Sequence, residues 1–298
     1  MLAVIRKILP ECIKEVCRRI RARLLSIGLS HAGPFALPDE EVVSSGDFSV
    51  IVPIHDAPEV TKRCLDSIEL YSGRAEVILV DDGSRLQETR DLIRDYEHRN
   101  AWKVFTHDQP LGHSRACEAG SRLATRRYLC FLNSDTVVTP WSWCGAKDAF
   151  DADPRIAITG PFTSAACTKQ NVRRAKWCRQ YWTDNQIYDF ARKLVSKQPA
   201  KSWVDMPDVD GFAFFIRRSV WDELGGFHPD LPDYGNETEL CKRVLAKGYK
   251  IVFVKNSYIH HFGGASIERV MTHAEITERH ISTRRFIDNL YGTGTGKS

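Results

Sequence analysis

The segment FLNSDTVV, residues 131–138, is an apolar run that stops abruptly at Asn133, Ser134 and Asp135 and then resumes a strand-like pattern. Asn, Ser and Asp are common turn formers, so a plain turn is one interpretation. The other interpretation is that a buried strand carries a metal-binding carboxylate to the edge of a sheet. The neighbouring segments favour the second.

Apolar segments alternate with helical periods along residues 48–135. The predicted strands are FSVIVPI (48–54), EVILVDDGS (76–84), WKVFTH (102–107) and YLCFLNSD (128–135), and the predicted helices span 58–71, 85–99 and about 113–125. This alternation indicates βαβ units and a parallel sheet. Ligands of such sheets bind beyond the carboxyl ends of the strands, where both DDGS and NSD lie.

The second half of the chain is less regular. Residues 141–205 are rich in Trp, Arg and Lys and show no clear period. Beyond them we expect a strand and a short helix over 208–227, a helix over 235–249, a strand entering a His- and Gly-rich loop over 250–266, and a final helix over 267–289.

The composition is that of an ordinary soluble globular protein. The chain has 298 residues, of which 43% are apolar and 27% charged. None of the nine cysteines forms a CxxC pair, so free thiols in a reducing cytosol are the simpler account. The net charge is +4, but residues 1–25 alone carry +5, so the basic excess is local. No nucleic-acid partner is expected, because such a partner calls for a basic stripe across the folded domain.

Residues 1–29 have the spacing of a basic amphipathic helix, and residues 30–47 have the composition of a linker. Charges interrupt every apolar run, so neither a signal peptide nor a membrane span is predicted. Two interpretations stay open: residues 1–25 contact an anionic membrane, or they pack on the domain. The expected location is the cytoplasm, with peripheral contact at the inner face of the cell membrane in the first case.

Oxygen-bearing side chains end three of the predicted strands, and more follow later together with two histidines. The oxygen-bearing residues are Asp56, Asp81, Asp82, Asn133 and Asp135, then Asp210, Glu237 and Glu239, and the histidines are His260 and His261. Oxygen ligands with one imidazole suit Mn²⁺ or Mg²⁺, which prefers few protein ligands plus substrate phosphates. Singly, each residue has an ordinary alternative, such as a turn, an acid at a helix start or a core histidine.

The order VIVPIHDAPE, EVILVDDGS, FLNSDTVV, VDGFAFFIRRSVWDELGGF, GNETELCKR and IHHFGGAS resembles the inverting nucleotide-sugar glycosyltransferases of family 2. The likeness is greatest to rhamnosyl- and galactosyl-type enzymes of bacterial cell-surface polysaccharides, and it covers residues 48–266. It implies a GT-A fold, in which a Rossmann-like, mostly parallel sheet carries helices on both faces. Residues 48–140 would form the nucleotide-binding half and 141–266 the acceptor half, followed by a C-terminal helix and tail at 267–298.

The resemblance also implies roles for single residues. Glu237 falls on the catalytic base, Asp135 on the metal-binding member of the DxD motif, and His261 on the histidine near the metal and diphosphate. The donor-binding residues implied are Pro53, His55, Asp56, Asp81, Asp82, Gly112, Asn133, Ser134, Asp210 and Gly211. Three positions depart from the family pattern: Asn133 replaces the first Asp of DxD, Asn236-Glu237 replaces a Glu-Asp pair, and Cys117-Glu118 stands where relatives often carry Asn.

The implied function is transfer of a sugar, with inversion, from a nucleotide-diphosphate donor to a hydroxyl of a glycan or lipid-linked glycan, with Mn²⁺ or Mg²⁺ as cofactor. Residues 165–205 are expected to cover the acceptor side. Asn133 keeps a second hypothesis open, a catalytically degenerate protein that only binds nucleotide or a partner. A nucleotidyltransferase would need a Gly-rich phosphate segment after the first strand, which VIVPIHDAPEV lacks.

Overall fold

The structure is a computed structural model that describes residues 45–292, apart from 167, 173–182 and 264–272. The predicted amphipathic helix (1–29), nearly all of the linker (30–47) and the end of the tail (293–298) lie outside these residues. So do parts of the Trp- and Arg-rich segment and of the Gly-rich loop after His261.

Eight strands form one sheet, in the order β3-β2-β1-β4-β8-β6-β9-β7. The parallel strands of the first half are β1 (Phe48–Ile54), β2 (Glu76–Asp81), β3 (Lys103–Thr106) and β4 (Tyr128–Leu132). β8 (Ala213–Arg217) runs antiparallel between β4 and β6 (Ile156–Phe162), β9 (Lys250–Tyr258) is parallel to β6, and β7 (Trp203–Asp205) is an antiparallel edge. The sheet is therefore mixed but mostly parallel.

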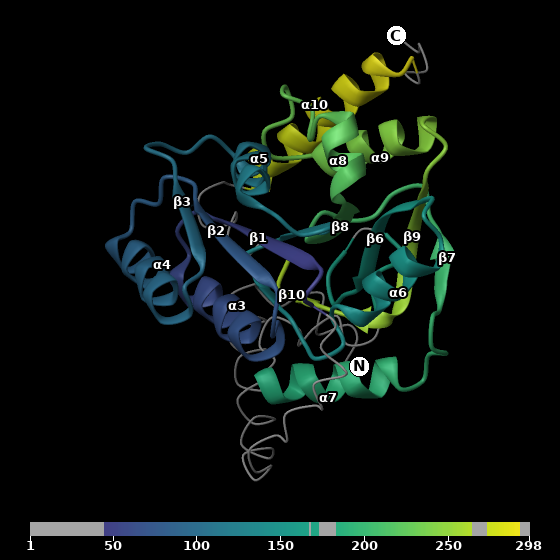
Figure 1. Cartoon of the computed structure of the whole chain (residues 1–298). Coiled ribbons are helices and arrows are strands. Elements are labelled where there is room, and N and C mark those ends of the chain that lie inside the picture. Colours follow the sequence, from purple (N-terminus) through teal and green to yellow (C-terminus); the bar gives the residue numbers. More distant parts are fainter. Residues whose placement is uncertain (1–44, 167, 173–182, 264–272, 293–298) are drawn as a thin grey trace, which may run out of the picture.

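Helices cover both faces of this sheet (Figure 1). One face carries α3 (Pro58–Tyr71), α4 (Gln87–Asn100) and α6 (Cys144–Ala152), which bury side chains such as Leu65 and Trp143 against β1 and β8. The other face carries α5 (His113–Leu123), α8 (Arg218–Leu224) and α9 (Asn236–Ala246). α7 (Asp184–Val195) packs beside the end of β9, and α10 (His273–Leu290) lies next to α9.

The alternating burial of β1 explains the two layers. Val50, Val52 and Ile54 face the α3 side, while Ile51 faces the α5 side, and all are fully buried. Because successive strand residues point to opposite faces, a strand covered on both sides needs an unbroken apolar run. The sequence prediction of β1 and α3 is confirmed to the residue.

Gly120 explains how closely α5 approaches the sheet. A β-carbon at this position would lie 3.0 Å from a methyl of Val80 and still closer to Ile51. The missing side chain lets α5 lie directly on β1 and β2. The helix thus carries its first residue, His113, to the carboxyl ends of these strands.

The irregular segment 141–205 contains α6, β6, α7 and β7, which its sequence pattern did not predict. A second, two-stranded sheet pairs β5 (Thr136–Val137) antiparallel with β10 (His260–His261). Among the helices that the structure describes, none is long and apolar enough to cross a lipid bilayer. Cys64, Cys117, Cys130, Cys144 and Cys241 are free thiols.

Candidate active site

Asp135 and His261 form the centre of the candidate site. The β5–β10 pairing sets His261 opposite Thr136, and the backbone N–H of Phe262 donates to the carbonyl of Asp135. The Nε2 atom of His261 lies 3.3 Å from Oδ1 of Asp135, whose side chain is almost fully buried. The strand end of FLNSD is therefore joined to a histidine far along the chain.

The environment of His261 fits a metal ligand. Its Nδ1 lies 2.9 Å from the carbonyl oxygen of Ala165, and its ring stacks on Phe212 at 5.2 Å. A ring nitrogen bound to a carbonyl fixes the tautomer that leaves Nε2 for a metal. Burial lowers the pKa of His261, but the charge and hydrogen bond of Asp135, the Ala165 carbonyl and Asp210 outweigh it and raise the pKa.

These two side chains suit a cation that takes most of its ligands from elsewhere. No cluster of three or more His, Cys, Asp or Glu side chains that could hold a metal occurs within the described residues. Mg²⁺-like ions commonly accept one or two protein ligands and complete their shell with water and substrate phosphates. Asp135 and His261 therefore fit such an ion, and Asn133 adds no carboxylate.

The backbone at Asn133 and Ser134 forms a turn that also borders the candidate site. The N–H of Asn133 donates to the carbonyl of Phe212 at 2.9 Å, and its own carbonyl accepts from the Thr136 hydroxyl at 2.7 Å. Ser134 is buried. These bonds fasten the end of β4 to the segment that precedes β8, so the two interpretations of FLNSDTVV are compatible.

Glu237 lies in the first turn of α9, behind Gly235, which takes the left-handed conformation with φ of 71°. Its N–H bonds to Oδ1 of Asn236 at 3.0 Å. Burial raises the pKa of Glu237 to about 7; a bond from its own N–H lowers it, and repulsion from Asp210 and Asp208 raises it further. The carboxyl group is thus half protonated near neutral pH.

The segment Asp210-Gly211-Phe212 links Glu237 to the Asp135–His261 pair. A β-carbon on Gly211 would lie 3.2 Å from Cδ of Glu237, so the glycine backbone borders this carboxyl group. Phe212, the next residue, stacks on His261 and accepts from Asn133. Glu237 and the Asp135–His261 pair therefore flank one short strip of backbone.

Gln170 supports this strip, although nothing in its local sequence indicates a role. It is fully buried, and its Oε1 accepts from the N–H of Asp210 at 2.7 Å while its Nε2 donates to the carbonyl of Pro161 at 3.0 Å. The N–H of Thr168 donates to Oδ2 of Asp210 at 3.0 Å. Only the fold brings this segment beneath the site.

On the nucleotide side, Asp82 holds a loop in place. Its Oδ1 accepts from the N–H of Leu111 at 2.9 Å and lies 2.8 Å from Nδ1 of His107, while its Oδ2 accepts from the N–H of Gly112 at 2.9 Å. Gly112 has φ of 93°, which suits glycine. The side chain of Asp82 therefore positions residues 107–112, and its predicted contact with base or ribose stays a prediction.

Two further predicted carboxylates also bind backbone. Oδ1 of Asp81 accepts from the N–H of Ser84 at 2.8 Å, and Oδ1 of Asp56 accepts from the N–H groups of Arg85 and Leu86 at 2.9 and 2.8 Å. These bonds shape the DDGS turn and lead the chain into α4. For both residues, a contact with the donor stays a prediction.

Pro53 and His55 lie at the end of β1. Pro53 is buried within the sheet and sits opposite Val80, past the last β4 pair at Ile51, so it lies where β1 and β4 separate. The Nδ1 atom of His55 lies 2.9 Å from the carbonyl oxygen of Asp82. A contact of either residue with the donor stays a prediction.

The loop before α9 contacts the start of α5 and so joins the loop held by Asp82 to Glu237. The N–H of His113 donates to Oδ1 of Asp233 at 3.3 Å, and Nδ2 of Asn236 donates to the hydroxyl of Ser114 at 2.8 Å. Burial lowers the pKa of His113, while the charges of Asp233, Asp82 and Asp135 raise it, which places this imidazole among the three carboxylates. The predicted residues thus converge on one rim of the sheet.

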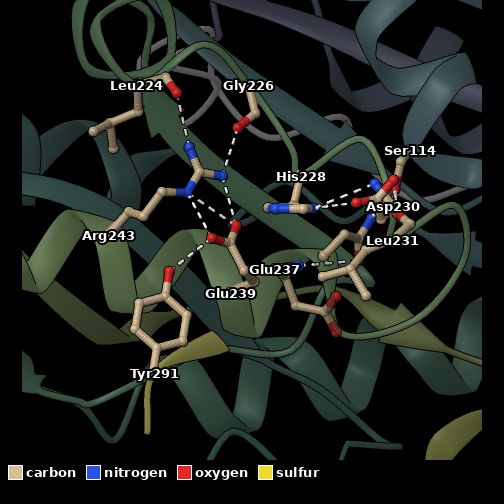
Figure 2. A network of polar contacts seen from close by, with 11 residues as sticks. Ser114, Leu224, Gly226, His228, Asp230, Leu231, Glu237, Glu239, Arg243 and Tyr291 are labelled. Atoms are coloured by element: carbon tan, nitrogen blue, oxygen red, sulfur yellow. Dashed lines mark hydrogen bonds and ion pairs between the residues drawn. The ribbon is translucent and has the colours of Figure 1, made fainter. Parts of the chain in front are cut away.

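Glu239, two residues after Glu237, has a structural role (Figure 2). Its carboxylate is held by the guanidinium of Arg243, at 2.6 Å between Oε2 and Nη2, and by the Tyr291 hydroxyl at 2.7 Å. Arg243 also donates to the carbonyls of Leu224 and Gly226 at 2.7 Å each. This network fixes α9 to the end of α8, while the carboxylate of Glu237 points away from Arg243.

Comparisons with known proteins identify the family. The model of the family described as glycosyl transferase family 2 matches residues 49–225, more than half of the chain. Among curated proteins, the chain is 23% identical over 225 residues to the O-antigen biosynthesis protein RfbC of Myxococcus xanthus, covering 73% of this chain and 17% of that protein. It is 23% identical over 213 residues to the probable glycosyltransferase YdaM of Bacillus subtilis, covering 69% of this chain and 48% of the relative. The chain thus spans less than half of either relative.

Two solved structures share the fold. One is the mannosyltransferase PcManGT of Pyrobaculum calidifontis in complex with GDP-Man and Mn²⁺, at a TM-score of 0.58, 16% identity, and coverage of 97% of this chain and 75% of that one. The other is GalNAc-T7 with UDP, GalNAc and Mn²⁺, at a TM-score of 0.58, 20% identity, and coverage of 76% and 47%. The expected GT-A fold is confirmed, and the chain belongs to glycosyl transferase family 2.

Proposed function

We propose that this chain transfers a sugar from a nucleotide-diphosphate donor to a hydroxyl group of a glycan or lipid-linked glycan, with inversion at the anomeric carbon. One observation carries the proposal. A carboxyl group whose pKa is raised to about 7, that of Glu237, borders the same backbone strip as the buried Asp135–His261 pair. A proton acceptor and a place for a charged leaving group thus lie side by side.

Glu237 acts as the general base. An acceptor hydroxyl loses its proton only as the new bond forms, and a base is most effective when its pKa lies near the working pH. The repulsion from Asp208 and Asp210 and the burial of Glu237 give its carboxylate that basicity. A single displacement, in which the acceptor hydroxyl deprotonated by Glu237 attacks the anomeric carbon directly, inverts the anomeric centre.

Asp135 and His261 would hold Mn²⁺ or Mg²⁺, which supplies positive charge to the departing diphosphate. The Ala165 carbonyl keeps the imidazole oriented, and Phe212 keeps its ring plane fixed. The donor-binding role of Asn133, Ser134, Asp210 and Gly211 follows from their place around this pair. Two structural neighbours carry Mn²⁺ with UDP or GDP-Man, which supports this part of the proposal.

The nucleotide lies over the loop that Asp82 holds. Residues 107–112, which Asp82 holds, and the turns that Asp56 and Asp81 shape are the backbone segments that we assign to contact it. An acceptor from cell-envelope glycan synthesis is supported by the likeness to an O-antigen biosynthesis protein. Residues 1–25 provide peripheral contact with an anionic membrane where such acceptors reside.

The test has two stages. Thermal stabilisation by a panel of UDP-, GDP- and dTDP-sugars, with and without Mn²⁺, identifies the donor. Donor hydrolysis and transfer are then compared in the wild type, in Glu237→Gln and in Glu223→Gln, which changes an exposed glutamate on α8. We expect Glu237→Gln to bind the donor and lose transfer, and Glu223→Gln to keep both.

Normal turnover by Glu237→Gln would remove Glu237 from the mechanism. A wild-type protein that binds a nucleotide sugar with Mn²⁺, but neither hydrolyses nor transfers it, would favour the catalytically degenerate alternative.

A further inference from the structure

A basic hollow lies at the end of the central strands opposite the candidate active site. It has a volume of about 460 Å³ and is lined by Arg126, Arg127, Arg217, Arg218 and Ser219, with Asp222 as the acid in the lining. Tyr128, also in the lining, begins β4 and pairs with Phe48, the first residue of β1, and with Arg217, the last residue of β8. Asp82, Asp135 and Glu237 lie beyond the other ends of these strands. We call this feature the arginine hollow.

Two of its arginines are fixed parts of the fold. Arg217 donates from Nε to the carbonyl of Ile156 at 2.7 Å and from Nη2 to the carbonyl of Asp153 at 3.2 Å. Arg218 donates to the carbonyl of Ala124, and its Nε lies 3.4 Å from Oδ2 of Asp222. These bonds neutralise little of the positive charge, because most of them end on neutral carbonyl groups.

The other two arginines, Arg126 and Arg127, are exposed to solvent and can bind a ligand. Within the described part of the chain, neither Arg126 nor Arg127 forms an ion pair, and Arg127 lies over the ring of Tyr128 at 5.3 Å. The acids near the hollow pair with lysines, although the charge of Arg127 also acts on Asp151. Asp151 pairs with Lys147 at 2.6 Å, and Asp153 pairs with Lys250 at 3.1 Å.

The charge and shape of the arginine hollow select one class of ligand. Four guanidinium groups against one carboxylate leave a charge of about +3 around a space of the size that small ligands occupy, about 300–1,000 Å³. Guanidinium groups bind phosphate oxygens in a planar, bidentate manner. Ser219 adds a hydroxyl donor at the rim.

We propose that the arginine hollow is a second binding site, separate from the active site, for a phosphate-bearing anion that Arg126 and Arg127 grip. The same phosphate chemistry is offered by a soluble phosphate compound and by the headgroup of an anionic lipid. The backbone N–H of Tyr128 donates to the carbonyl of Asp47, so β1 begins at this same end of the sheet.

The experiment uses the full chain and two matched double variants. Arg126→Ala/Arg127→Ala removes the exposed pair of the hollow, and Arg284→Ala/Arg285→Ala removes an adjacent pair of exposed arginines on α10. Pyrophosphate is titrated calorimetrically in the presence of EDTA, which suppresses metal-dependent binding at Asp135. Co-sedimentation with phosphatidylglycerol vesicles, compared with phosphatidylcholine vesicles, forms the second arm.

We expect the hollow variant to lose at least about tenfold in affinity in one arm, while the α10 variant keeps wild-type affinity. Loss in the pyrophosphate arm identifies a soluble phosphate compound, and loss in the vesicle arm identifies a lipid headgroup. The proposal is overturned if the hollow variant matches the wild type in both arms, if both double variants lose affinity equally, or if the wild type binds neither probe.

Discussion

Glu237→Gln should make the folded protein more stable at neutral and alkaline pH while it abolishes transfer. The folded state raises the pKa of Glu237 from its ordinary value of 4.5 to about 7, chiefly through burial. The ionised carboxylate is therefore disfavoured by folding, and the wild type loses stability as the pH rises from about 4.5 through about 7. Glutamine has a similar shape and no charge, so this loss disappears.

The size of the effect follows from the pKa change. A rise from 4.5 to about 7 corresponds to about 3 kcal/mol of unfolding free energy at pH 8, where the group is ionised in both states. At pH 5.5 the folded carboxyl is still protonated and the difference shrinks to about 1 kcal/mol. The gain in Glu237→Gln should therefore grow by about 2 kcal/mol between these two pH values.

Urea denaturation of both proteins at pH 5.5, 7 and 8 measures this dependence. Glu239→Gln is the matched control, because Glu239 lies on the same helix but is nearly fully buried against Arg243. Removing one charge of a buried ion pair leaves the other without compensation, so this variant should lose about 3 kcal/mol. The free energy of unfolding should thus rise in Glu237→Gln and fall in Glu239→Gln, although the two glutamates are only two residues apart.

The reasoning is refuted if Glu237→Gln is less stable than the wild type at pH 8, or if its gain is the same at pH 5.5 and pH 8. Either result would mean that the Glu237 carboxylate is well solvated in the folded protein. Its role as a base tuned by burial would then lose its physical support.

Two further predictions concern the turn and the metal site. Gly83 has φ of 65°, and a β-carbon there would lie 2.6 Å from the backbone of Gln109, so Gly83→Ala should cost more than about 3 kcal/mol of unfolding free energy. Gly248→Ala, at φ of 82° with no atom within 4 Å, should cost only about 1 kcal/mol, and equal losses in denaturation would contradict the steric argument. Asp135→Asn should weaken Mn²⁺-dependent binding of UDP by at least about tenfold in calorimetry, and unaltered affinity would place the ion elsewhere.

Much of the first half of the fold is predictable because its signals are local. The buried run of β1, the apolar face of α3 and the polar ends of β2 and β4 are all properties of short segments. Parallel strands end at one edge, so the convergence of Asp82 and Asn133–Asp135 followed from the alternation alone. The resemblance to family 2 added the later motifs around Asp210, Glu237 and His261.

The irregular segment 141–205 was not predictable in this way. β6 contains Gly160 and Pro161 and becomes a strand because β8 and β9 pair with it on either side. Gln170 is fully buried only because a neighbouring glycine leaves room for it and Asp210 bonds to it. Neither the pairing of β6 nor the burial of Gln170 can be predicted from the local sequence pattern.

The amino-acid sequence by itself determined which side chains lie at the ends of the strands, because the spacing of apolar residues within short segments distinguishes strands from helices. Only the tertiary structure decided what those side chains do. Asp56, Asp81 and Asp82 bind backbone N–H groups, Glu239 forms an ion pair, and Glu237 has a raised pKa. Burial and Coulomb interactions depend on distances between residues far apart in the chain, and folding alone sets those distances.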